Sequence, residues 1–116
     1  MYKEIILDLY KNPRNFRALS NKTHSQRLYN PLCGDDITID LLVDKADVIQ
    51  EVGFVGESCA ICRASASLLT DYIKGKKRSE LVQLNAGFMQ DLMGIEISAG
   101  RVKCLLLPLE VLKKML

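Results

Sequence analysis

The sequence lacks the features that mark nucleic-acid-binding, membrane and secreted proteins. Its 16 basic and 14 acidic residues leave a formal net charge of +2, which is too small to indicate a nucleic-acid partner. No apolar run approaches the roughly 18 residues that a membrane span needs, and residues 1–4 do not open a secretory signal. We therefore expect a cytoplasmic protein with no membrane segment.

Histidine and clustered charge are also scarce. Histidine occurs once, as His24 within the polar segment 15–25, and we interpret it as a surface side chain rather than a metal ligand. Basic residues cluster at positions 74–78, a segment that we interpret as a solvated turn. With so little histidine, any metal chemistry has to come from other side chains.

The length of 116 residues indicates a single domain, residues 1–116, and 48% hydrophobic residues suffice for a globular core. Helical spacing of apolar residues from Tyr2 to Tyr10 predicts a first helix, which Asn12-Pro13 ends. Residues 15–25 read as a loop. Alternating apolar residues then predict an antiparallel hairpin of strands 37–43 and 48–55, and a short strand at 27–29 is also expected.

The second half of the chain changes to helical periodicity. A helix is predicted from about Ala60 to Lys74, with Gly75 as its C-terminal cap. Another helix is expected to start after Ser79 as N-cap and to bury Leu81, Leu84, Phe88 and Leu92. Pro108 fits the first turn of a final helix, which leaves Cys104 just upstream. The outline is an α+β fold: a small antiparallel sheet of about three strands against four to five helices.

Four cysteines stand beside turn-forming or charged residues: Cys33, Cys59, Cys62 and Cys104. In a reducing compartment such cysteines more often bind metal or carry out transfer chemistry than form disulfides. Cys59 and Cys104 each precede a predicted helix, whose positive N-terminal end lowers the pKa of a thiol. The sequence therefore predicts sulfur chemistry.

Convergence of three loops on one site is the natural inference from these positions. Asp35 follows Cys33 closely, and three thiolates with one carboxylate meet the four-ligand requirement of tetrahedral zinc or iron. The C-x-x-C pair Cys59 and Cys62 also suggests a thioredoxin-like redox motif, although no parallel strand–helix–strand context accompanies it.

Five segments, in order along nearly the whole chain, resemble the IscU/SufU family of iron–sulfur cluster assembly proteins, which is NifU N-terminal-like. They are Asp8–Asn15 (DLYKNPRN), Asn30–Asp35 (NPLCGD), Gly56–Cys59 (GESC), Arg63–Ser67 (RASAS) and Arg101–Cys104 (RVKC). The resemblance implies an α+β fold of this family.

The resemblance also implies a function. It implies that Cys33, Asp35, Cys59 and Cys104 bind zinc, iron or a nascent [2Fe–2S] cluster, and that sulfur arrives from a cysteine desulfurase. Apo iron–sulfur proteins are then the recipients of the cluster. We expect a scaffold and sulfur acceptor rather than a true enzyme, with Cys104 as the acceptor.

The chain departs from both branches of the family. Lys103 stands where the IscU branch has a histidine, and the Leu-Pro-Pro-Val-Lys segment for an Hsp70-type chaperone is absent, so we expect no such partner. The long insertion of the SufU branch is absent too.

Cys62 stands where the family usually has a small residue, and it is either core filler or a further metal ligand. Arg101 and Lys103 either are solvated or lower the pKa of Cys104.

Three functions therefore stay open at the level of sequence. The first is an iron–sulfur cluster assembly scaffold. The second is a zinc-dependent sulfurtransferase that accepts sulfur from a desulfurase without building a cluster. The third is a zinc-stapled interaction domain without transfer chemistry. Zinc and iron–sulfur sites use the same thiolates, so the sequence alone does not separate them.

Overall fold

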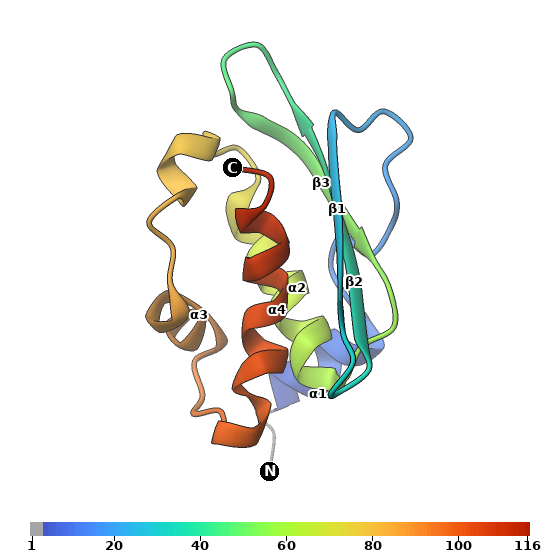
Figure 1. Ribbon diagram of the computed structural model, residues 1–116, viewed down its shortest axis with the longest axis vertical. Coiled ribbons are helices and arrows are strands. Elements are labelled where there is room, and N and C mark those ends of the chain that lie inside the picture. Colours follow the sequence, from blue (N-terminus) through green and yellow to red (C-terminus); the bar gives the residue numbers. More distant parts are fainter. Residues whose placement is uncertain (1–3) are drawn as a thin grey trace.

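The computed structural model describes residues 4–116 as a three-stranded antiparallel sheet with helices on one face (Figure 1). The α+β prediction is confirmed. The longer elements are α1 (Glu4–Lys11), β1 (His24–Asn30), β2 (Asp35–Val43), β3 (Ile49–Val55), α2 (Ala60–Ile73), α3 (Ala86–Met93) and α4 (Val102–Lys113). Two short 3₁₀ helices are η1 (Arg78–Leu81) and η2 (Ala99–Arg101). No helix in residues 4–116 is long and apolar enough to cross a membrane.

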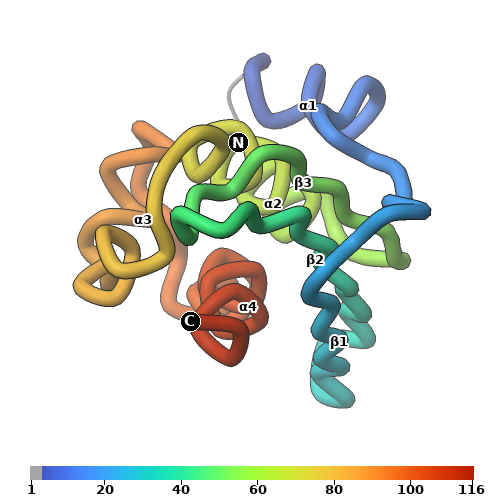
Figure 2. The backbone as a smooth tube through the Cα atoms, turned by 90° about the horizontal axis from the view of Figure 1, so that it is seen from above, coloured from blue at the N-terminus to red at the C-terminus, as the bar shows by residue number. Residues whose placement is uncertain are grey.

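The sheet has the strand order β1-β2-β3, with both neighbouring pairs antiparallel. Alternation along β2 places Ile37, Ile39 and Leu41 on one face, where each is fully buried. Helices α2 and α4 cover that face, and α3 lies outside them (Figure 2). The core is therefore the layer between the sheet and these two helices.

The opposite face of the sheet is covered by the segment between α1 and β1. Asp40 on this face is 3% exposed, and its carboxylate accepts hydrogen bonds from the Leu19 amide at 3.0 Å and the Ser25 hydroxyl at 2.6 Å. A Cβ on Gly53 would lie 2.2 Å from the Arg17 carbonyl oxygen, so the covering segment touches the sheet directly. This covering segment ends earlier than the predicted loop, because β1 begins at His24.

The first two helices follow the sequence prediction closely. Helix α1 ends at Lys11, before Pro13, as expected, while Tyr2 lies outside the described residues. Helix α2 begins at Ala60 and ends at Ile73. The helical periodicity of this segment predicts a buried stripe that includes Ile61, Ala64, Leu69 and Ile73, and all four are buried. The same periodicity also includes Tyr72, which is 37% exposed.

The predicted helix start at Ser79 is wrong. Residues around Ser79 form only the short helix η1, and α3 begins later, at Ala86. Asn85 is its N-cap, because the Asn85 side chain accepts a hydrogen bond from the Phe88 amide at 2.9 Å. Gly94 closes the helix in a left-handed conformation.

Helix α4 also begins earlier than expected. It starts at Val102, so Cys104 lies in its first turn and Pro108 lies in its interior. The placement of Pro108 in the first turn, with Cys104 upstream, is therefore wrong. Pro108 lacks the N–H that a helix residue donates to the carbonyl four residues earlier, here that of Cys104. The short helix η2 leads directly into this first turn.

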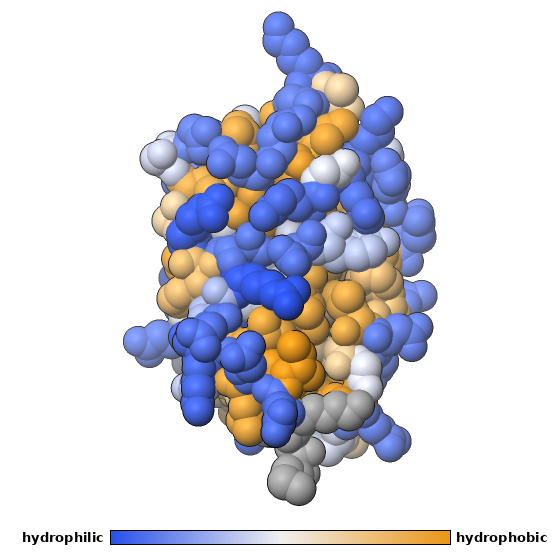
Figure 3. Space-filling view, turned by 180° about the vertical axis from the view of Figure 1, so that it is seen from behind, coloured by the Kyte–Doolittle hydropathy of each residue, from blue (hydrophilic) through white to orange (hydrophobic). Residues whose placement is uncertain are grey.

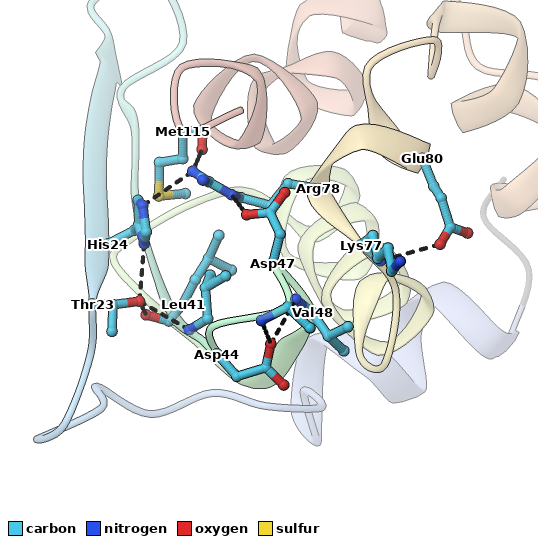
Figure 4. Close-up of polar contacts among 12 residues, drawn as sticks. Thr23, His24, Leu41, Asp44, Asp47, Val48, Lys77, Arg78, Glu80 and Met115 are labelled. Atoms are coloured by element: carbon cyan, nitrogen blue, oxygen red, sulfur yellow. Dashed lines mark hydrogen bonds and ion pairs between the residues drawn. The ribbon is translucent and has the colours of Figure 1, made fainter.

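The basic segment at residues 74–78 is not wholly solvated, because Arg78 is half-buried (Figure 4). Its guanidinium donates hydrogen bonds to the Asp47 carboxylate at 2.7 Å and to the Met115 carbonyl at 2.8 Å. It also lies 3.0 Å from Nε2 of His24. Arg78 thus ties the β2–β3 turn, β1 and the end of α4 together, and His24 serves this structural contact.

Candidate metal centre

Three segments distant in sequence meet at one end of the molecule, the lower end in Figure 1: the β1–β2 turn, the start of α2 and the start of α4. They carry Cys33, Cys59 and Cys104. One ligand atom from each of Cys33, Asp35 and Cys104 lies within 4.8 Å of the others. The fold therefore assembles a group of sulfur and carboxylate donors there.

Asp35 is the centre of this group and is only 1% exposed. Its Oδ2 accepts a hydrogen bond from the Cys33 thiol at 3.2 Å, and Cys59 Sγ lies 3.8 Å from the same oxygen. Its Oδ1 accepts the backbone N–H of Cys59 at 2.9 Å. Cys59 therefore adjoins the group through Asp35, although it lies outside the tightest set of donor atoms.

Local backbone geometry explains how the first two segments come together. Gly34 adopts a φ of +75° in the β1–β2 turn, which only glycine adopts without strain, and its amide bonds the Asn30 carbonyl at 2.8 Å. A Cβ on Gly56 would lie 1.8 Å from the Asp36 carbonyl oxygen. The residues just before Cys59 therefore pack directly against the start of β2.

Cys62 is placed differently from the other three cysteines. It is completely buried in the hydrophobic core and lies outside the donor group formed by Cys33, Asp35 and Cys104. Burial raises the pKa of the Cys62 thiol, and the nearby Asp35 and Cys59 add to the rise, while the Ser58 hydroxyl opposes it. In this geometry Cys62 fills core space, as one of its two sequence interpretations expects.

The expected lowering of the Cys104 pKa is wrong. Cys104 is 1% exposed, and burial raises its pKa, followed by hydrogen bonds with Asp35 and Cys59. The positive end of α4 and the neighbouring cations Arg101 and Lys103, both exposed, do not outweigh the loss of hydration. A base or a metal ion must therefore help this thiol to lose its proton.

The donor group opens to solvent through a shallow hollow of about 290 Å³. The residues that line it are Asn30, Leu32, Cys33, Ala99, Gly100, Lys103 and Cys104. Leu32 is 80% exposed in the turn beside Cys33. Apolar surface also shows at this lower end of the molecule when it is seen from behind (Figure 3). An incoming ion or small sulfur species can thus reach the cysteines.

The chemistry of the donor set suits a soft or borderline cation. Among residues 4–116, no cationic side chain lies within ion-pair distance of Asp35. A buried carboxylate without a counter-charge is costly, and three neighbouring thiols add negative charge once they ionise. Zinc or iron bound by thiolates and this carboxylate would balance that charge.

Two structural contributors were not identified from the sequence. Ser65 is fully buried, and its hydroxyl donates to the Leu105 carbonyl at 2.7 Å, which ties α2 to the start of α4. The Asn30 side chain accepts the Leu32 amide at 3.0 Å and shapes the turn before Cys33. Asn30-Pro31 is a recognisable turn signal. A serine in a helix gives no comparable signal.

Comparisons with known proteins agree with this architecture. The sequence model of the NifU-like N terminal domain matches residues 1–116. The zinc-dependent sulfurtransferase SufU of Bacillus subtilis is 33% identical, over 98% of this chain and 88% of its own length. The iron–sulfur cluster assembly scaffold protein IscU of Haemophilus influenzae is 30% identical, over 97% of this chain and 90% of its own.

A solved structure gives the same result for the fold. The crystal structure of a putative iron–sulfur cluster assembly scaffold protein for the SUF system, from Fervidobacterium islandicum, superposes with a TM-score of 0.84 at 29% identity. The match covers 97% of this chain and 94% of that one. With the domain match over its whole length, the chain belongs to the NifU-like N-terminal domain family.

Proposed function

We propose that this protein is an iron–sulfur cluster assembly scaffold, which receives sulfur from a cysteine desulfurase and holds a metal ion or nascent cluster. Cys33, Asp35, Cys59 and Cys104 are the proposed ligands. The observation that carries the proposal is the close group of Cys33, Asp35 and Cys104, with Cys59 hydrogen-bonded to the same carboxylate. Its relatives named IscU and SufU support this reading.

The ligand set determines what the site can do. Three sulfur donors and one carboxylate suit either zinc or iron, and a carboxylate is the weakest of the four toward soft metals. The hollow beside Cys33 leaves room for a sulfur donor to approach. Apo iron–sulfur proteins are the proposed recipients, and the four free cysteines suit the reducing cytoplasm.

Metal analysis of cysteine variants tests the ligand set. The purified protein should hold about one zinc per chain, and Cys33→Ser, Cys59→Ser and Cys104→Ser should each lose most of it. Cys62→Ser is the matched control, since Cys62 lies outside the donor group. Unchanged zinc in the first three variants would contradict the proposed ligands.

A zinc-dependent sulfurtransferase is the second candidate. Two observations favour it. Lys103 precedes Cys104, at the position where the resemblance to the IscU branch implies a histidine. The SufU relative is named a zinc-dependent sulfurtransferase. Anaerobic reconstitution with iron, cysteine and a desulfurase separates the two. A scaffold develops the visible absorption of a cluster and passes it to an apo-ferredoxin, whereas a sulfurtransferase delivers sulfur only.

A further inference from the structure

Cys59 and Cys62 stand three residues apart at the start of α2, in the spacing of a C-x-x-C pair. Cys59 is the N-cap of α2, and its carbonyl accepts the Arg63 amide at 3.0 Å, which closes the first helical turn. Across such a turn, Cα atoms three residues apart lie about 5 Å apart, as the rise and radius of an α-helix require. Disulfides span Cα separations of about 4.4–6.8 Å, so side-chain rotation can bring the two sulfurs together.

The exposure of the two sulfurs is unequal. Cys59 is partly exposed beside Asp35, whereas Cys62 is fully buried. A strand, a turn and a helix that begins with C-x-x-C are all present here, as β3, residues 56–59 and α2. In dithiol redox sites an accessible cysteine at a helix N-terminus carries the adduct, and a second cysteine one turn later displaces it.

A route for sulfur to Cys59 also exists. Cys104 Sγ lies within 4.8 Å of an Asp35 carboxylate oxygen, and Cys59 Sγ lies 3.8 Å from Asp35 Oδ2, so a persulfide on Cys104 has Cys59 within its reach. Attack by the Cys59 thiolate on the outer sulfur transfers that sulfur, leaving a persulfide on Cys59 and a thiolate on Cys104. No electrons enter or leave in this exchange.

We propose that Cys62 resolves the persulfide on Cys59 and releases its outer sulfur as sulfide. This step rests on the proposed function, which supplies the persulfide. Cys62–SH attacks the inner sulfur of Cys59–S–SH; a Cys59–Cys62 disulfide forms, the S–S bond of the persulfide breaks, and the outer sulfur departs as H₂S with the Cys62 proton. The two thiols are oxidised to the disulfide, and sulfane sulfur is reduced to sulfide.

The consequence is that the chain supplies, for one turnover, the two electrons that convert transferred sulfur into the sulfide a cluster contains. A dithiol reductant must then reopen the disulfide before the next turnover. The buried position of Cys62 keeps it away from external oxidants. This role requires a cysteine at position 62, whereas core packing requires only a small side chain there.

A single-turnover experiment tests this step. The full chain, stripped of metal with a chelator, is loaded anaerobically with inorganic polysulfide, desalted, and followed for sulfide release and for disulfides by peptide mass spectrometry. The parent should release sulfide without added reductant and form the Cys59–Cys62 disulfide, at least about tenfold faster than Cys62→Ser, because the reaction is intramolecular. Cys62→Ala, checked by circular dichroism, guards against misfolding of the serine variant.

Equal sulfide release from the parent and both Cys62 variants, or a disulfide that joins another pair, would overturn the inference. Because polysulfide loads the cysteines without a desulfurase, that result leaves the scaffold proposal intact. Conversely, a chain that takes no sulfur from a desulfurase but resolves polysulfide sulfur through Cys62 upholds this step and contradicts the scaffold proposal.

Discussion

Asp35 begins strand β2 and at the same time bonds to both segments that flank it. Its two carboxylate oxygens accept hydrogen bonds from the Cys33 thiol and the Cys59 amide. The positions of these two cysteines therefore depend on one side chain. The sequence pattern Cys33-Gly34-Asp35 was sufficient to predict its membership of the site. The bond to the Cys59 amide was not predictable, because it depends on how β3 returns alongside β2.

Gly56 is not a proposed ligand, yet its replacement should disturb the site strongly. Gly56→Ala is expected to destabilise the fold by about 2–4 kcal/mol, because its φ of +135° is open only to glycine and the new Cβ would overlap the Asp36 carbonyl. Gly75→Ala is the control: its φ is +87°, with nothing within 4 Å, so about 1–2 kcal/mol is expected. Urea unfolding measures both, and equal losses would contradict the overlap argument.

Cys104 should be the first cysteine to carry persulfide. It adjoins the open hollow, and its Sγ lies within 4.8 Å of Cys33 Sγ and of an Asp35 carboxylate oxygen. After incubation with a desulfurase and cysteine, mass spectrometry should find one added sulfur on Cys104 at the earliest times, and Cys104→Ser should delay or abolish the modification. The absence of persulfide on every cysteine, together with no stimulation of desulfurase turnover, would favour the zinc-stapled domain.

At the scale of elements, the β2–β3 hairpin depends on an exposed carboxylate. Asp44 accepts the amides of Ala46 at 2.8 Å and Val48 at 3.0 Å, and the side chain of Gln50 at 2.5 Å. The backbone bond to Val48 lowers the pKa of Asp44, with help from the other donors against the opposing effect of burial. The hairpin turn is thus more stable when this group is ionised.

The pH dependence follows from the sign of that shift. A carboxyl whose pKa is lower in the folded state stabilises the fold above its ordinary pKa of 3.8, and the stabilisation is lost as the pH falls through the folded value. Asp44→Ala should therefore lose stability at neutral pH, and its deficit should shrink toward about pH 3. Asp44→Asn keeps an acceptor and is the control. A pH-independent deficit in urea unfolding of Asp44→Ala would contradict the prediction.

The elements differ in how well the sequence predicts them. The alternation along β2 and the period along α2 are strong because each has one fully buried face. The start of α3 was missed because Asn85 and Ser79 are equally good N-cap residues, and the sequence does not choose between them. The start of α4 was missed because Pro108 is tolerated inside the helix, although proline favours a first turn. The pKa of Cys104 was misjudged because burial is a tertiary property.

At the scale of the whole molecule, the candidate ligands join three segments that are far apart in sequence. Zinc binds the folded chain through all three, so loading should raise the free energy of unfolding by about 2.7 kcal/mol at about one hundred times the dissociation constant. Calorimetry with zinc and with a chelator measures the rise in Tm. Cys104→Ser removes the ligand from α4 and should lose most of the rise, and an undiminished rise in that variant would place the metal elsewhere.

The proline inside α4 has a consequence for motion. Because Pro108 leaves the Cys104 carbonyl without its helical donor, the first turn of α4 is joined to the rest by one backbone hydrogen bond fewer. That turn can then open on its own, at a smaller free-energy cost than unfolding the molecule. Its amide hydrogens should exchange with solvent sooner than those beyond Pro108. If Cys104 is the sulfur acceptor, as proposed, opening of this turn exposes its thiol while the sheet and α2 stay packed.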